Sequence, residues 1–221
     1  MATDRANPDA DLHQVQVAVL AKAPIAGLAK TRLIPALGPQ GAARLQRQFT
    51  QNAVRVAQAA GLGPVTLWAA PDAQHRFFGA MVRATGVVCV AQPIGDLGQR
   101  MHTAFRFHCA QGRPLLLTGT DCPPLQAAHL RAAARALLDG DDAVFYPAQD
   151  GGYVLVGLLQ PQAALFDDMV WSTSTVMAET RSRAHALGLR VREFETLWDV
   201  DTPADLARWR ASTSPSLAAS P

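Results

Sequence analysis

Short apolar runs alternate with longer amphipathic segments along most of this 221-residue chain. Runs typical of buried or half-buried strands occupy residues 15–21, 65–70, 87–90, 114–118, 142–147, 153–159 and 189–194. Apolar residues at helical spacing and helix start signals predict helices over residues 39–60, 73–84, 95–110, 125–138 and 175–187, a short helical piece near 161–168, and a last helix from 203 to about 209. Strands that alternate with helices predict a doubly wound α/β fold with a largely parallel sheet.

The second half of the chain interrupts this alternation. Only about five residues separate the strands predicted at 142–147 and 153–159, whereas a parallel crossover needs about a dozen or more. These two strands cannot be parallel neighbours, so we predict a mixed, mostly parallel sheet. No internal repeat or linker divides the chain, and we expect a single domain over residues 14–211 with disordered tails at 1–13 and 212–221.

Composition and charge narrow the class of protein. A formal net charge of +2 gives no reason to expect nucleic-acid binding. The polar N-terminus lacks the apolar core of a signal peptide, and no run approaches the roughly 18 apolar residues of a membrane span. Three scattered cysteines without a CxxC pair disfavour a disulfide framework or a zinc ribbon, so we expect a cytoplasmic protein. The oligomeric state is not indicated by the sequence.

One aspartate directly follows a predicted central strand. Residues 114–125 read PLLLTGTDCPPL, in which three leucines indicate a strand buried on both faces and Asp121 precedes Cys122 and two prolines. Proline cannot continue a central strand, so the chain leaves the sheet at Asp121. Open α/β sheets bind their ligands at this carboxyl edge. The alternative is that Asp121 caps a helix that begins near Pro123 or Pro124.

Cations and a second carboxylate are predicted at the same edge of the sheet. Lys22, Lys30 and Arg32 follow the first strand, and Asp199 precedes the last helix. Lysine and arginine suit phosphate groups, and Asp121 with Asp199 suits Mg²⁺, which takes only one or two protein carboxylates. The alternative is a solvated basic loop and an aspartate that only marks the start of a helix.

Six segments of the chain carry a family resemblance. They read AKAPIAGLAKTRL, QPIGDLGQRM, LLLTGTDCPPL, DGGYVLVGL, WSTSTV and DVDTPADL, within residues 15–210. In this order and spacing they resemble the glycosyltransferase-like proteins of the GT-A fold, in the nucleotide-diphospho-sugar transferase superfamily. Relatives in that superfamily include molybdenum-cofactor guanylyltransferase and other nucleotidyltransferases. The resemblance implies a Rossmann-like, three-layer α/β/α fold.

The resemblance also implies roles for individual residues. The loop after the first strand would receive the nucleotide and its phosphates, and Asp121 and Asp199 would hold a divalent cation, Mg²⁺ or Mn²⁺. Asp199 is preferred to Asp201 as the second ligand, because the start of the last helix can use Asp201. The predicted nucleotide-binding residues are Ala21, Lys22, Ala23, Pro24, Gly27, Lys30, Arg32, Gln92, Asp96 and Arg100, and the predicted catalytic residues are Asp121, Asp150 and Lys30. For Gln92, Asp96 and Arg100 the alternative role is to cap and orient the helix at 95–110.

A glycine-rich turn is interpreted as part of the acceptor site. Asp150, Gly151 and Gly152 are predicted to contact the acceptor or the donor sugar together with Trp171, since glycine lets a backbone approach a ligand closely. Asp150 can act as general base for an attacking hydroxyl group. The alternatives are a tight hairpin turn at the glycines and a core or lid position for Trp171. Cys122 is expected to be a packed side chain rather than a nucleophile.

These inferences predict a metal-dependent transferase that uses a nucleotide-activated donor. The leading interpretation is a glycosyltransferase that acts on a nucleotide sugar and an unidentified small-molecule acceptor. The first alternative is a nucleotidyltransferase that couples a nucleoside triphosphate to a phosphorylated small molecule and releases pyrophosphate. The second alternative is a non-catalytic nucleotide-binding protein.

Overall fold

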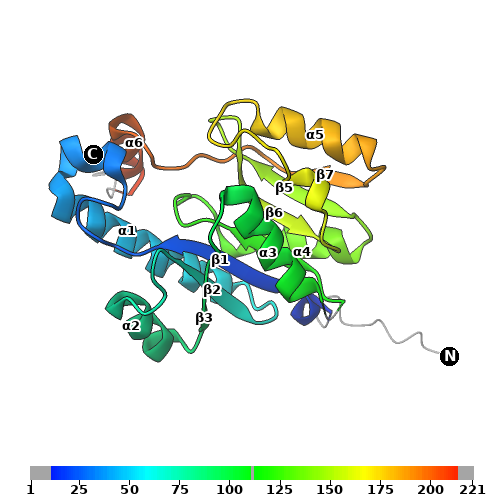
Figure 1. Ribbon diagram of the computed structural model, residues 1–221, viewed down its shortest axis with the longest axis horizontal. Helices are drawn as coiled ribbons and strands as arrows, with labels where there is room; N and C mark the ends of the chain where they lie inside the picture. The colour runs from blue at the N-terminus through cyan, green and yellow to red at the C-terminus, as the bar shows by residue number, and fades with distance from the viewer. Residues whose placement is uncertain (1–10, 111, 214–221) are drawn as a thin grey trace, which may run out of the picture.

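A mixed seven-stranded sheet forms the centre of the protein, in a computed structural model that describes residues 11–110 and 112–213 (Figure 1). Its strands lie in the order β3-β2-β1-β4-β6-β5-β7. Only β6 runs antiparallel to its neighbours, β4 and β5, which confirms the mixed, mostly parallel sheet. The strands are β1 (Gln16–Lys22), β2 (Val65–Ala70), β3 (Val88–Ala91), β4 (Leu115–Thr118), β5 (Ala143–Pro147), β6 (Tyr153–Leu158) and β7 (Val191–Glu193).

Helices cover both faces of the sheet and complete the predicted three layers (Figure 1). Side chains of α1, α2 and α4 pack into the core on one face, and those of α3 and α5 pack on the other. The α-helices are α1 (Ile34–Ala59), α2 (Arg76–Thr85), α3 (Leu97–Cys109), α4 (Ala127–Leu138), α5 (Val176–Ala186) and α6 (Pro203–Thr213). Short 3₁₀ helices occupy Leu12–Gln14, Thr31–Leu33 and Ala163–Leu165.

The alternation of side chains along the central strands explains the two cores. In β1, Val17 and Val19 point to the face covered by α1, α2 and α4, whereas Ala18 and Leu20 point to the face covered by α3 and α5. All four residues of β4 are buried, as the run of leucines predicts for a strand with a core on each side.

Most helix ends differ from the sequence prediction by one to three residues, and those of α1 and α6 differ by more. Gly38 has non-helical backbone angles (φ 67°, ψ 164°) inside α1, so the long helix begins at Pro39 as predicted, after one extra turn at 34–37. The last helix continues to Thr213, beyond the predicted end. Of the tails, residues 1–10 and 214–221 lie outside the described residues, but Leu12 is buried in the core. Apolar contact therefore orders the chain two residues before the predicted domain start.

The segment that follows β7 crosses the carboxyl edge of the sheet. Leu197 donates its N–H to the carbonyl of Pro147 at 2.9 Å, and Val200 donates to the carbonyl of Asp121 at 2.8 Å. These bonds carry the chain from the end of β5 to the end of β4 before α6 begins. No helix of the described residues is long and apolar enough to cross a membrane.

Candidate active site

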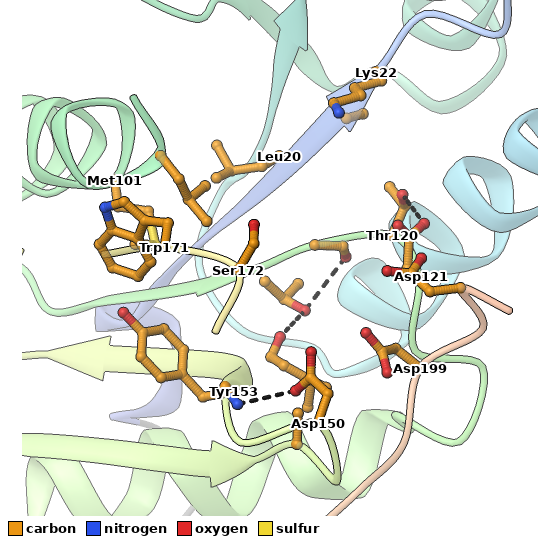
Figure 2. A pocket seen from close by; sticks show the side chains of 18 of the residues that line it. Leu20, Lys22, Met101, Thr120, Asp121, Asp150, Tyr153, Trp171, Ser172 and Asp199 are labelled. Carbon is orange, nitrogen blue, oxygen red and sulfur yellow. Dashed lines mark hydrogen bonds between the residues drawn. The ribbon is translucent and has the colours of Figure 1, made fainter. Parts of the chain in front are cut away.

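A cavity of about 550 Å³ opens at the carboxyl edge, where β1 and β4 lie side by side. From β1 the chain adds β2 and β3 on one side of the sheet, and from β4 onward it adds strands on the other side. The gap between the ends of β1 and β4 is therefore the topological switch point of the sheet. We call its two parts the polar end and the apolar end (Figure 2). The polar end is lined by Lys22, Lys30, Arg32, Gln46, Thr120, Asp121, Asp150, Asp199 and Asp201, and the apolar end by Leu20, Leu97, Met101, Leu117, Tyr153, Val156 and Trp171.

Asp121 lies in the loop after β4 and is held by hydrogen bonds. Thr120 donates its hydroxyl to Asp121 Oδ1 at 2.9 Å, and the buried Gln46 amide of α1 donates to Thr120 Oγ1 at 3.0 Å. The next helix begins at Ala127, with Gln126 as its N-cap. The alternative that Asp121 caps this helix is therefore wrong, and its carboxylate faces the cavity.

Lys30 is a buried cation at the centre of the polar end. Its side chain is 3% exposed, and its Nζ lies 3.0 Å from Asp121 Oδ1 and 3.5 Å from Asp201 Oδ1. It also donates to the carbonyl of Val200 at 2.8 Å and lies 5.2 Å from the centre of the Phe49 ring. The idea of a solvated basic loop is therefore wrong for Lys30, whereas the neighbouring Arg32 side chain is 70% exposed.

Asp199 reaches the cavity on the segment that crosses the sheet edge. Figure 2 shows its carboxylate beside that of Asp121, above Asp150. Burial, and after it the nearby carboxylates of Asp201, Asp150 and Asp121, raise the pKa of Asp199 to about 6. Negative charge is thus crowded at this point of the polar end.

Asp201 lines the cavity, and its carboxylate is not used by the helix start, a role that the sequence had left open for it. Its carboxylate lies near Lys30 and 3.7 Å from Arg32 Nη1. The start of α6 instead uses Thr202 and Asp205, because Asp205 Oδ2 accepts from the Thr202 N–H at 2.8 Å and the Asp205 N–H donates back to Thr202 Oγ1 at 3.3 Å. This reciprocal pair is a capping box.

The polar end suits a divalent cation bound through few protein ligands. Within residues 11–110 and 112–213, no group of three or more His, Cys, Asp or Glu side chains is arranged to hold a metal ion. Asp121 and Asp199 nevertheless line one cavity, and Mg²⁺ needs only one or two carboxylates when water and phosphate oxygens complete its shell. The crowding that raises the pKa of Asp199 would be relieved by such a cation.

The predicted nucleotide-binding residues divide into two groups. Those that line the cavity are Ala21, Lys22, Lys30, Arg32, Gln92 and Arg100, and those outside its lining are Ala23, Pro24, Gly27 and Asp96. The local roles given as alternatives are present for Asp96 and Arg100, whereas the Gln92 side chain donates to strand carbonyls and not to the helix. Asp96 accepts from the Gln99 N–H at 2.8 Å and caps α3, Arg100 donates to the Gly95 carbonyl at 2.9 Å, and Gln92 donates to the carbonyl of Trp68 at 2.9 Å.

The glycine-rich turn joins β5 to β6 and also reaches the cavity. The hairpin alternative is confirmed, since Asp150 Oδ1 accepts from the Gly152 N–H at 2.9 Å between two antiparallel strands. Asp150 and Gly152 line the cavity, whereas Gly151 does not. Gly151 has φ +92°, and a Cβ there would lie 2.1 Å from the Ser174 carbonyl oxygen, so only glycine fits this contact.

Some residues of the site could not be singled out from the sequence. Gln46 offers a weak signal, because it is a polar residue beside the apolar stripe of a long helix. Thr120 and Ser172 lie within the segments that carry the resemblance, but nothing in their spacing marks them. Tyr153 directly follows the glycine-rich turn and was interpreted with it as part of the acceptor or donor-sugar site. Cys122 is packed as expected: burial raises its pKa to about 12, which leaves the thiol protonated and disfavours a nucleophilic role.

The fold and the site define the class: the protein has the fold of the nucleotide-diphospho-sugar transferases, with an open cavity at the switch point of the sheet. A crystal structure from Desulfovibrio desulfuricans, described as a proposed nucleotide-diphospho-sugar transferase, is 28% identical with a TM-score of 0.82 over 92% of this chain and 89% of that one. The chain belongs to the family described as an uncharacterized protein conserved in bacteria (DUF2064), whose model matches residues 53–173.

Two more distant structures share the fold. A nucleotidyl transferase from Methanothermobacter is 17% identical, with a TM-score of 0.62 over 90% of this chain and 96% of that one. Glucosyl-3-phosphoglycerate synthase from Mycobacterium tuberculosis, solved with Mn²⁺, uridine diphosphate and glucosyl-3-phosphoglycerate, is 9% identical, with a TM-score of 0.54 over 91% of this chain and 76% of that one. No curated protein matches the chain.

Proposed function

We propose that this protein is a metal-dependent glycosyltransferase that moves a sugar from a nucleotide sugar to a small-molecule acceptor. The observation that carries the proposal is the buried Lys30 paired with Asp121, beside Asp199, at the switch point of the sheet. Cations for phosphate and carboxylates for a divalent ion thus line one cavity. The name given to the Desulfovibrio structure supports the same donor class.

The residues of the polar end suit the steps of sugar transfer. Asp150 would accept the proton of the acceptor hydroxyl group while the oxygen of that group bonds to the anomeric carbon of the sugar. The bond from that carbon to the diphosphate oxygen would break, and its electron pair would leave with the diphosphate. Lys22, Lys30 and Arg32, which line the same cavity, would share the negative charge of the departing phosphates. A divalent cation held by Asp121 and Asp199 would stabilise the same negative charge.

Nucleotide binding is the first test. We expect one or more nucleoside diphosphate sugars to raise the melting temperature of the protein in the presence of Mn²⁺ or Mg²⁺, and to do so less with EDTA, since a ligand of the folded form stabilises it. Nucleotide binding that is indifferent to the divalent ion would favour the non-catalytic alternative.

The second test follows the products of the reaction. With the nucleotide sugar found in the first screen, release of nucleoside diphosphate supports glycosyl transfer, whereas release of pyrophosphate from a nucleoside triphosphate would support the nucleotidyltransferase alternative. Asp121→Asn and Asp199→Asn should each lower kcat about a hundredfold. Asp141→Asn is the matched control, because Asp141 pairs with Arg192 through its Oδ2 at 2.6 Å outside the cavity lining. Equal rates for parent and Asp121→Asn would contradict the proposal.

A further inference from the structure

Two buried hydrogen-bond donors at the apolar end have no partner. Among the described residues, Tyr153 Oη and Trp171 Nε1 are the buried side-chain polar atoms that make no hydrogen bond. Tyr153 begins β6, and Trp171 lies in the loop between the 3₁₀ helix Ala163–Leu165 and α5. Leaving a buried donor unpaired costs about 1–3 kcal/mol of stability. Such groups in a native protein call for an explanation, such as a missing ligand.

The same fold satisfies comparable groups elsewhere. Tyr146, on the neighbouring strand β5, donates its hydroxyl to the carbonyl of His129 at 3.3 Å. Trp68, in β2, donates its indole N–H to His108 Nε2 at 3.2 Å. The two exceptions, Tyr153 and Trp171, both line the cavity and pack against each other edge to face, with ring centres 6.5 Å apart. The unpaired donors are therefore concentrated at a site and not spread through the core.

Apolar side chains form much of this end of the cavity, although Arg100, Ser172 and Thr173 belong to the same lining. Leu20, Met101, Leu117 and Val156 come from β1, α3, β4 and β6, and Figure 2 shows Leu20 and Met101 close to the Trp171 ring. A polyhydroxylated molecule placed here would lose hydrogen bonds to water without replacing most of them. An apolar body would instead keep the favourable contact with these side chains.

The loop that carries Trp171 is held in place by close packing. Asp168 and Ser172, on either side of Trp171, have positive φ angles of 52° and 65°, which are uncommon for residues other than glycine. Gly98 of α3 permits the contact, because a Cβ there would lie 2.9 Å from Trp171 Nε1 and 2.6 Å from the Phe166 carbonyl oxygen. Strained backbone of this kind occurs at ligand clamps.

We propose that the apolar end is the acceptor subsite and that the acceptor is an alcohol with an apolar body, which contacts the Trp171 ring, and a second oxygen that accepts a hydrogen bond from Tyr153 Oη. The reacting hydroxyl would face Asp150, at the boundary with the polar end. That the bound alcohol is an acceptor rests on the proposed glycosyl transfer, whereas the binding of the alcohol to this subsite does not. The two can therefore be tested apart.

Binding is tested first, without any nucleotide, by isothermal titration of three probes. The probes are 4-methoxybenzyl alcohol, which has the apolar ring and the second oxygen, 4-ethylbenzyl alcohol, which lacks that oxygen, and inositol, which is a polar ring of similar size. We expect the methoxy compound to bind most tightly. Tyr153→Phe should weaken its binding about tenfold and leave binding of the ethyl compound unchanged. Tyr146→Phe removes a hydroxyl that already has a partner, so it should change the affinity for neither the methoxy nor the ethyl compound.

Three results would overturn the subsite: binding of inositol at least as tight as that of the methoxy compound, an unchanged affinity in Tyr153→Phe, or no binding of any probe. Turnover then separates the two proposals. If a nucleotide sugar binds with Mn²⁺ but only inositol or glycerol accelerates diphosphate release, the apolar acceptor is wrong and the glycosyltransferase stands. If the methoxy compound binds through Tyr153 and no nucleotide binds, the subsite stands and the proposed function fails.

Discussion

The two ends of the cavity differ in whether their buried polar side chains have hydrogen-bond or ion-pair partners. At the polar end, Lys30, Gln46 and Thr120 are buried, and each makes hydrogen bonds or ion pairs with named partners. At the apolar end, Tyr153 Oη and Trp171 Nε1 are buried with none. Both ends belong to one cavity and are built on adjacent strands of one sheet.

The difference shows which part of the site is complete in the protein alone. Groups that stabilise charge act best when they are fixed before the reaction. The hydrogen bonds from Gln46 through Thr120 to Asp121 fix the carboxylate that is proposed to hold the divalent cation. The apolar end holds donors that only a further molecule can satisfy. We therefore expect changes at the polar end to alter stability and rate strongly, and changes at the apolar end to alter binding with little cost in stability.

The largest effect is expected from Lys30→Met. Methionine keeps most of the volume of the side chain but removes the charge that pairs with Asp121 and Asp201 and the donor to the Val200 carbonyl. We expect the free energy of unfolding to fall by about 2–3 kcal/mol, less than for a fully buried pair because both carboxylates are partly exposed. Urea unfolding followed by circular dichroism measures the change.

Lys22→Met is the control for this variant, because Lys22 is an exposed residue at the end of β1 in the same cavity lining. Its free energy of unfolding should stay within about 0.5 kcal/mol of the parent value. If Lys30→Met were as stable as Lys22→Met, the polar end would not depend on its buried cation, and the contrast between the two ends would be lost.

A smaller effect with the opposite sign is expected from Asp199→Asn. Burial and neighbouring carboxylates raise the pKa of Asp199 to about 6 from its ordinary value of 3.8. Its contribution to stability is therefore fully present below pH 3.8 and is lost as the pH rises through about 6. Asparagine has no charge to lose, so without divalent ions the variant should be more stable than the parent at pH 7.5 by about 1 kcal/mol. Near pH 4 this difference should vanish.

The matched control is Asp205→Asn, since Asp205 supports the start of α6 through Thr202 and not the cavity. That variant should lose about 0.5–1 kcal/mol at pH 7.5. A parent protein that is as stable as Asp199→Asn at both pH values would show that Asp199 is not crowded.

Much of the fold could be predicted from the sequence, because local patterns determine it. The leucine run at 115–117 marked a central strand, and Gly38 followed by Pro39 marked the start of the long helix. The short spacing between two later strands was enough to exclude a parallel pair, which the antiparallel β5-β6 pairing confirms.

The site was most directly predictable from strand ends. Lys22 ends β1 and Asp121 follows β4, so the general geometry of doubly wound sheets brings them to one edge. Lys30, Asp150 and Asp199, which were also predicted, line the same cavity. The capping pair of Thr202 and Asp205 was readable from the sequence and is present. Asp201 was set aside as a possible helix-start residue, because no local signal shows that the segment after β7 runs along the sheet edge. The unpaired Tyr153 hydroxyl was equally hidden, since the lack of a partner is a property of packing and not of sequence.

The smallest effect, and the most direct comparison, concerns the two buried tyrosines. Tyr146→Phe removes a hydroxyl that donates to the His129 carbonyl, so the free energy of unfolding should fall by about 1 kcal/mol. Tyr153→Phe removes a hydroxyl that has no partner among the described residues, so stability should be unchanged or rise by up to about 1 kcal/mol. Chemical denaturation of both variants, at one pH and without ligand, measures the difference. Equal losses in the two variants would mean that Tyr153 has a partner such as a bound water, and the apolar end would then be as complete as the polar end. A gain in stability at Tyr153 together with a loss of binding for the methoxy probe is the pattern expected of a group kept for a ligand at the expense of the fold.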